Sequence, residues 1–220
     1  MEIRRVVVGP LDTNCWVIHS NGSAILVDPG DAPDRVLDAV RDLKVTAIVL
    51  THVHFDHVLA ADAVAEELDV PVLAHPAENA TWQHELAYFA ERGHYDAGTD
   101  TNKLLAAGVA LNVGTWSGRF TAIPPTLSVG ALEVEVLYTP GHSPGSITLA
   151  VPGHLFTGDT LFPGGPGLTT GPLCSFPAII ESVRGLLDYP PDTIVHPGHG
   201  LDTTVGREKP ALPSWIARGW

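Results

Sequence analysis

An apolar, strand-like run at residues 46–50 is followed directly by the sequence Thr-His-Val-His-Phe-Asp-His at residues 51–57. Alternate residues of an extended chain point to the same side, so His52 and His54 can face one common ion. Asp56 and His57 come next, at the expected start of a helix, and would face the same pocket. Because imidazole and carboxylate groups are typical metal ligands, four of them within six positions predict a metal site.

Three further ligand-type residues follow predicted strands and stand beside glycines. His142 lies in a Pro-Gly-His sequence, Asp159 in a Gly-Asp pair, and His199 in a second Pro-Gly-His. Strand ends at one edge of a sheet are where α/β proteins assemble their sites, and glycine lets backbone and ion approach closely. Alone, each of these histidines would more often be a turn residue, but together with the first cluster they provide seven ligands, which suit two ions.

Strand and helix patterns alternate along the chain. The first part predicts strands at 6–8, 15–19, 24–28, 46–50 and 72–74, with helices at 31–43, 58–68 and 79–92. The last part predicts strands at 132–138, 146–151, 154–157 and 193–196, a helix at 176–187 and a short helix from 203 onward. Residues 93–125 between them indicate a long loop or cover. This alternation predicts an α/β fold, and 220 residues without a linker or repeat indicate one domain over 1–220.

Composition narrows the class of partner. Twelve Lys and Arg residues against 25 Asp and Glu give a net charge of −13. That charge argues against nucleic acid and against an anionic membrane surface, which both need clustered basic residues. Two cysteines, Cys15 and Cys174, cannot form a disulfide framework, and no signal-peptide core is present, so we expect a cytoplasmic protein that acts on a small molecule.

The ligand motifs, taken in order, resemble those of the metallo-β-lactamase superfamily. They are His-x-His-x-Asp-His, Pro-Gly-His, Gly-Asp and Pro-Gly-His. The resemblance implies a four-layer αββα sandwich with its site at the edge where the two sheets meet. It also implies two divalent ions, with zinc favoured and iron or manganese as alternatives. The implied ligands are His52, His54 and His142 for the first ion, Asp56, His57 and His199 for the second, and Asp159 as a bridge between them.

Within the superfamily, the chain looks most like the short glyoxalase II-like (hydroxyacylglutathione hydrolase-like) enzymes, which cleave acyl thioesters. β-Lactamases of this fold commonly carry a cysteine where Asp159 stands, so antibiotic hydrolysis is disfavoured. The net charge disfavours the tRNA-processing branch. The resemblance implies a metal-bridging hydroxide as the nucleophile, oriented by Asp56 as the catalytic residue.

The chain departs from the glyoxalase II pattern at two places. Val58, Leu59 and Ala60 replace the usual glycine pair after Asp-His, and residues 161–170 lack the usual arginine. The identity of the thiol that the substrate thioester would release therefore stays open. Persulfide dioxygenases with a single iron resemble the chain at all seven ligand positions, and lactone or phosphodiester hydrolysis would use the same nucleophile, so these remain alternatives.

Residues near the motifs in sequence are candidates to anchor the ligand histidines, whose second ring nitrogens need partners. They are Asp28, Thr51 and Thr160. The C-terminal tail contains Trp215 and Trp220 and either packs on the body or forms a contact in a homodimer.

Overall fold

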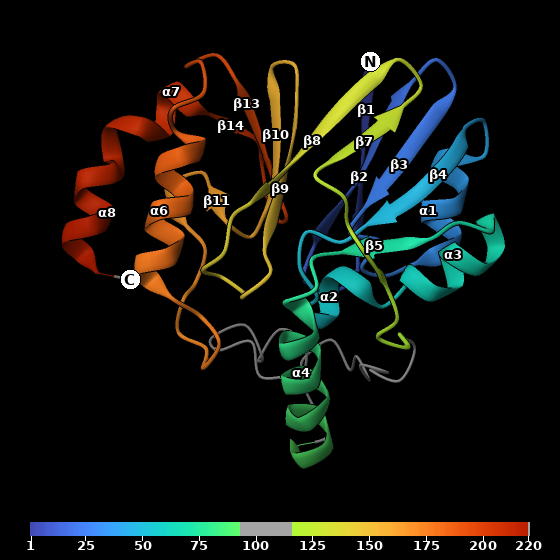
Figure 1. Cartoon of the computed structure of the whole chain (residues 1–220), viewed down its shortest axis with the longest axis horizontal. Coiled ribbons are helices and arrows are strands. Elements are labelled where there is room, and N and C mark those ends of the chain that lie inside the picture. The colour runs from blue at the N-terminus through green and yellow to red at the C-terminus, as the bar shows by residue number, and fades with distance from the viewer. Residues whose placement is uncertain (93–115, 220) are drawn as a thin grey trace.

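The computed structural model describes residues 1–92 and 116–219. Two six-stranded mixed sheets pack against each other, and helices cover their outer faces (Figure 1). This arrangement confirms the four-layer αββα sandwich expected from the sequence.

The first sheet has the strand order β1-β2-β3-β4-β5-β6. Its first three strands are antiparallel, and β3, β4, β5 and β6 then run parallel. Asn21 and Gly22 join β2 to β3 with φ angles of 52° and 80°, the positive values that a tight hairpin turn requires. The strands span Glu2–Val8, Thr13–Ser20, Ser23–Val27, Lys44–Val49, Val72–Ala74 and Thr121–Ala122.

The second sheet has the order β14-β13-β10-β9-β8-β7 and is antiparallel except for the pair β10 and β13. A small hairpin, β11 and β12, follows β10. The strands β7 to β14 span Thr126–Val129, Leu132–Tyr138, Ile147–Val151, His154–Gly158, Leu161–Phe162, Gly165–Pro166, Ile194–Pro197 and Thr203–Thr204.

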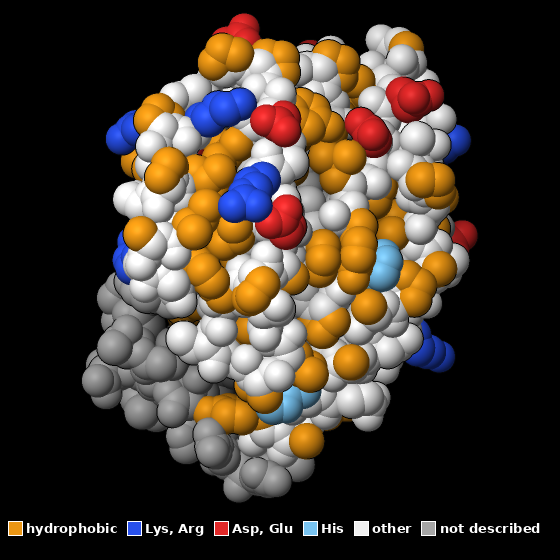
Figure 2. All heavy atoms as spheres, turned by 60° about the vertical axis from the view of Figure 1, so that its left-hand side comes forward, with side chains coloured by type: hydrophobic (Ala, Val, Ile, Leu, Met, Phe, Trp, Pro, Cys, Tyr) orange, Lys and Arg blue, Asp and Glu red, His pale blue; other side chains and the backbone are white. Residues whose placement is uncertain are grey.

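Helices α1 (Pro33–Val40) and α3 (Ala61–Leu68) cover the first sheet, while α6 (Phe176–Leu186) and α8 (Leu212–Arg218) cover the second (Figure 1). Short helices α7 (Val205–Glu208) and η3 (Lys209–Ala211) lead into α8. Helices α2 (Phe55–Val58) and α4 (Glu78–Arg92) lie at one end of the sandwich. Acidic, basic and hydrophobic side chains are interspersed on the face that α6 and α8 cover (Figure 2).

The inner strands β3, β4 and β5 are buried on both faces along most of their length, which explains their apolar runs, whereas the edge strands β1 and β6 are partly exposed. Along β3, Ala24 and Leu26 face the core under α1 and α3, whereas Ile25 and Val27 face the core between the sheets. A third core lies between the second sheet and α6, where Trp215 of α8 is only 3% exposed. The tail therefore packs on the body up to this residue, and Trp220 lies outside the described residues.

The helix predicted over 58–68 starts three residues later, at Ala61, and ends at Leu68 as predicted. Helix α2 ends at Val58, and the backbone N–H of Ala60 donates to the carbonyl of Pro29 (3.1 Å) instead of continuing the helix. A new helix, α3, then starts at Ala61. This break is set by a contact with a distant segment, which the local pattern does not contain.

Two other predictions of elements need correction. The expected helix from 203 onward starts at Val205, because Thr203 and Thr204 pair with β13 first and Thr204 then caps the helix. Strand β7 was absent from the prediction, since its alternating small polar residues gave a weak apolar signal. Residues 93–115 of the expected cover lie outside the described residues, and β6 occupies part of the rest. Among the described residues, no helix is both long and apolar enough to cross a membrane.

Candidate metal centre

The seven residues predicted as ligands lie at one edge of the sandwich, five of them in loops that follow strands and two on helix α2. His52 and His54 follow β4, and Asp56 and His57 lie on α2, which continues from the same loop. The other three follow strands of the second sheet: His142 comes after β8, Asp159 after β10 and His199 after β13. The two sheets thus bring together residues that are up to 147 positions apart (199 − 52).

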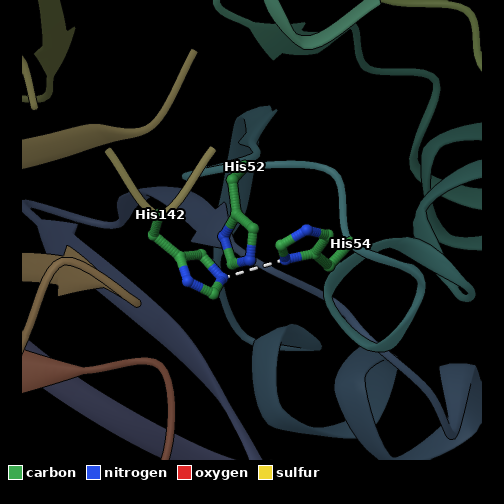
Figure 3. A group of neighbouring side chains, drawn as sticks. All are labelled: His52, His54 and His142. Carbon is green, nitrogen blue, oxygen red and sulfur yellow. Dashed lines mark hydrogen bonds between the residues drawn. The ribbon is translucent and has the colours of Figure 1, made fainter. Parts of the chain in front are cut away.

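The first group consists of His52, His54 and His142, one nitrogen of each lying within 4.8 Å of the others. Their rings converge from three directions (Figure 3). Nε2 of His142 is 2.9 Å from Nδ1 of His54, the contact drawn as a dashed line. Three imidazole nitrogens around one point can hold a divalent ion.

The second group consists of Asp56, His57 and His199, again with ligand atoms within 4.8 Å of one another. Nε2 of His57 is 3.3 Å from Nε2 of His199, which in turn is 3.2 Å from Oδ2 of Asp56. Two ligands that bind one tetrahedral zinc at about 2.05 Å are roughly 3.3 Å apart. The spacing of this group therefore suits a single metal ion.

Asp159 lies between the two groups. Its Oδ2 is 3.6 Å from Nε2 of His142 in the first group and 3.6 Å from Nε2 of His199 in the second. Its Oδ1 is 3.6 Å from Nε2 of His57. One carboxylate thus faces both groups, which is the position that a bridging ligand requires.

Hydrogen bonds at the backs of the rings set the tautomers of three histidines. Nδ1 of His142 donates to the carbonyl of Leu168 (2.8 Å), and Nδ1 of His199 donates to the carbonyl of Leu11 (3.0 Å). Nδ1 of His57 contacts a carboxylate oxygen of Asp28 at 2.9 Å and donates to it. Each ring therefore directs Nε2 into the centre, and its orientation is fixed from outside.

Asp28 and Thr51 hold the first motif as expected from the sequence. The Asp28 carboxylate is buried and accepts hydrogen bonds from the Thr51 backbone N–H (2.7 Å) and from the Thr51 hydroxyl (2.6 Å). The Thr51 oxygen lies 3.2 Å from Nδ1 of His52 and accepts from it, since its own proton points at Asp28. The expectation for Thr160 is wrong, because its hydroxyl contacts Thr139 and so braces the strand before His142.

Two buried polar atoms of the centre have no hydrogen-bond partner among the described residues. They are Nε2 of His52 and Oδ1 of Asp159. Leaving a buried acceptor without a partner is costly, and such atoms call for an explanation such as a bound ion. His52 belongs to the first group, and Oδ1 of Asp159 lies 3.6 Å from Nε2 of His57 in the second, so the residues present fit a metal centre.

The charges of the two groups differ. Burial opposes protonation of His57, but Asp56, Asp159 and Asp28 outweigh it and raise the pKa of its imidazole to about 10. Burial and the neighbouring His142 lower the pKa of His54 to about 3. The carboxylates thus attract positive charge to the second group. In the first group, burial also lowers the pKa of His52, so His52 and His54 offer neutral imidazoles, the form that binds metal.

Close approach of the backbone is required at Gly198, which precedes His199. A Cβ atom at this position would overlap Oδ1 of Asp159 and crowd the ring of His57. Glycine is therefore needed here to let the His199 loop and the β10 loop share the centre.

Sequence reasoning missed the role of Thr13 at the start of β2. Its hydroxyl donates to Oδ2 of Asp56 (2.9 Å). The next residue, Asn14, ties β2 to the His199 loop through its backbone N–H to the Gly198 carbonyl (2.7 Å) and its side-chain amide. A polar Thr-Asn pair directly before the apolar run at 15–18 was the available signal.

Residues 8–199 match the model of the family described as "Metallo-beta-lactamase superfamily". The chain belongs to this superfamily. It is 32% identical over 218 residues to "Probable metallo-hydrolase YqgX" of Bacillus subtilis, covering 97% of both chains. It is 30% identical over 219 residues to "Hydroxyacylglutathione hydrolase GloC" of Haemophilus influenzae, again covering 97% of both. These relatives support a metal-dependent hydrolase as the general class.

Two solved structures are similar along almost the whole chain. "BLEG-1 B3 metallo-beta-lactamase" is 29% identical, with a TM-score of 0.77 and coverage of 97% of this chain and 99% of that one. "TTHA1623 in a di-iron-bound form" is 33% identical, with a TM-score of 0.76 and coverage of 94% and 96%. The second structure shows that a member of this fold can hold iron.

Proposed function

We propose that the chain is a binuclear metal-dependent hydrolase that cleaves acyl thioesters. The observation that carries this proposal is the position of Asp159 between two separate groups of ligand atoms. The thioester is supported by the similarity to the Haemophilus protein, whose name describes hydrolysis of a hydroxyacyl thioester of glutathione. In this proposal His52, His54 and His142 bind one ion, Asp56, His57 and His199 bind the other, and Asp159 bridges them.

Two divalent ions bound here would supply an activated water at neutral pH and polarise a carbonyl oxygen. The protein would orient that water through Asp56. Its Oδ2 is held by the Thr13 hydroxyl and lies near Nε2 of His199, so the carboxylate is fixed where it can accept a proton from the nucleophile. A departing thiol has a pKa of about 8.5, so it leaves readily as thiolate and needs no strong acid from the protein.

The proposal is tested with the metal-loaded protein and two thioesters, one of a hydroxyacyl group with glutathione and one with coenzyme A. Release of free thiol is followed with a thiol-reactive dye. We expect hydrolysis by the wild type and its loss in His54→Ala, together with loss of bound metal. A fully loaded protein that releases no thiol from either compound would contradict the thioester proposal.

A second candidate is hydrolysis of a β-lactam ring. Asp159 disfavours it, but the similarity to the BLEG-1 structure favours it. A chromogenic cephalosporin in the same assay distinguishes the two, because ring opening changes its absorbance without releasing a thiol. If iron-loaded protein instead consumed oxygen in the presence of a persulfide, that result would support the dioxygenase alternative. No zinc preference is implied by the residues alone, since histidine and carboxylate also bind iron.

A further inference from the structure

Glu78 is a buried acid at the start of α4, close to the first group of ligands. Its side chain is completely buried, although an acid at this end of a helix commonly faces solvent. Burial raises the pKa of Glu78, and hydrogen bonds from three donors act in the opposite direction. A carboxylate held in this way has a structural or functional task, because burying it without partners would be costly.

The three donors come from the two loops that carry the first group of ligands. Oε2 of Glu78 accepts from the backbone N–H of Val53, the residue between His52 and His54, at 2.8 Å. Oε1 accepts from the hydroxyl of Ser143 (2.6 Å), the residue after His142, and from the backbone N–H of Gly145 (2.6 Å). One carboxylate thus joins the His52–His54 loop to the His142 loop.

The fit between Glu78 and the second loop is tight. A Cβ atom at Gly145 would lie 2.8 Å from Cγ and Oε1 of Glu78, so the loop needs glycine to approach the carboxylate. The Ser143 hydroxyl also contacts the Ser146 hydroxyl at 2.6 Å, which orders the turn around it.

The two loops also meet at the strand side of the centre. There the backbone N–H of Ile147 donates to the carbonyl of Thr51 (2.9 Å). Glu78 makes a second connection between the same two loops, through the residues next to His54 and His142, whose ring nitrogens lie 2.9 Å apart although 88 positions separate the two histidines.

We propose that Glu78 is a positioning residue that sets the separation of His54 and His142 and thereby the affinity of the first group for its metal ion. The proposal rests on the metal centre proposed above and does not depend on which substrate is cleaved. Within the described part of the chain, the carboxylate makes its hydrogen bonds to neighbours of the ligand residues and none to the two rings. It acts through the backbone on either side of the rings.

The test is Glu78→Gln, which keeps the size of the side chain but replaces one acceptor with a donor. Whichever way the amide turns, it presents N–H to a loop that needs an acceptor. We expect the affinity of the first ion to fall at least about 10-fold, as it does when residues that orient metal ligands are changed. The second ion, held by Asp56, His57 and His199, should bind with nearly the affinity found in the wild type.

Zinc affinity is measured by competition with a chromophoric chelator, and the geometry of the first site by the visible spectrum of cobalt-substituted protein. The matched control is Glu208→Gln, a buried glutamate that accepts from the Thr203 hydroxyl and from the Gly164 backbone N–H. It should lower the melting temperature and leave both zinc affinities and the cobalt spectrum unchanged.

A Glu78→Gln protein with both wild-type affinities and a wild-type cobalt spectrum would overturn the proposal. Equal weakening of the two ions, in step with loss of folded protein, would overturn it too, since that result indicates a purely structural role. If this variant does not fold, Ser143→Ala removes one of the three donors and leaves the carboxylate in place. It should weaken the first ion by a smaller factor, and an unchanged affinity would contradict the proposal.

The outcome is separable from the test of the proposed function, because it is measured by metal binding without substrate. A protein that binds two ions but cleaves no thioester leaves this proposal standing. A wild-type protein that binds no ion overturns the metal centre and this proposal together.

Discussion

Replacing Asp28 by Asn should change which nitrogen of His57 carries the proton. One oxygen of Asp28 accepts from the Thr51 backbone N–H, and the other accepts from the Thr51 hydroxyl and from Nδ1 of His57. The NH2 of the Asn side chain cannot face the fixed Thr51 backbone N–H, because both are donors. It must therefore take the place of the oxygen that faces the Thr51 hydroxyl and His57. There it donates to Nδ1 of His57, and the ring proton moves to Nε2.

The magnitude follows from the position of that proton. Nε2 of His57 is the atom that faces His199, and a protonated nitrogen cannot bind a metal ion. Changing the partner of a ligand histidine typically weakens metal binding by roughly 10- to 100-fold. That factor corresponds to about 1.4–2.7 kcal/mol of binding free energy. The loss through His57 falls on the second ion. The Thr51 hydroxyl also loses its acceptor at this position, so the contact that orients His52 in the first group should change as well, by less than the contact of His57.

The assay is a competition titration with a chelator on the wild type and Asp28→Asn, analysed for two binding constants. We expect Asp28→Asn to bind the second ion more weakly than the wild type does, while the circular dichroism spectrum stays unchanged. Glu208→Gln serves again as the buried control outside the centre. If Asp28→Asn bound both ions as tightly as the wild type, the tautomer argument would be refuted.

Three further predictions follow from single contacts. Burial raises the pKa of Glu85 to about 7 from 4.5, so the folded protein keeps this proton between those values while the unfolded chain has lost it, and stability falls as pH rises through that window. In metal-free urea denaturation, the free energy of unfolding of Glu85→Gln should therefore rise by about 3 kcal/mol relative to that of the wild type between about pH 4 and pH 8. Parallel curves of unfolding free energy against pH would contradict this. Gly198→Ala should lose bound metal with little change in fold, because its Cβ overlaps Asp159, and full metal content by elemental analysis would show that the overlap is tolerated. Trp215→Ala should cost about 3–5 kcal/mol in the same denaturation experiment and leave the number of bound ions unchanged, whereas a loss of less than about 1 kcal/mol would mean that the tail is not part of the core.

The residues that were predictable from the sequence are those whose signal is local. His52, His54, Asp56 and His57 stand within six positions, and the structure places them as that spacing suggested. The double burial of the first sheet was visible in the apolar run at 46–50. Asp159 became a candidate bridge only through the resemblance to a family, since one Gly-Asp pair carries little information.

The contacts that were not predictable join segments far apart in the chain. Glu78 looks in sequence like an ordinary acid at the start of a helix, and its partners lie 25 and more positions away. Thr13 and Asp56 are 43 positions apart. The break after α2 likewise depends on the carbonyl of Pro29, so only the folded chain reveals it.

The most direct test of the central claim is the metal content of the purified protein, measured by mass spectrometry after purification without chelator or nickel resin. The account predicts about two divalent ions per chain in the wild type and a loss of at least one in His54→Ala. A wild-type protein that holds one ion or none, even after incubation with excess zinc, iron or manganese, would contradict the two-ion centre built around Asp159.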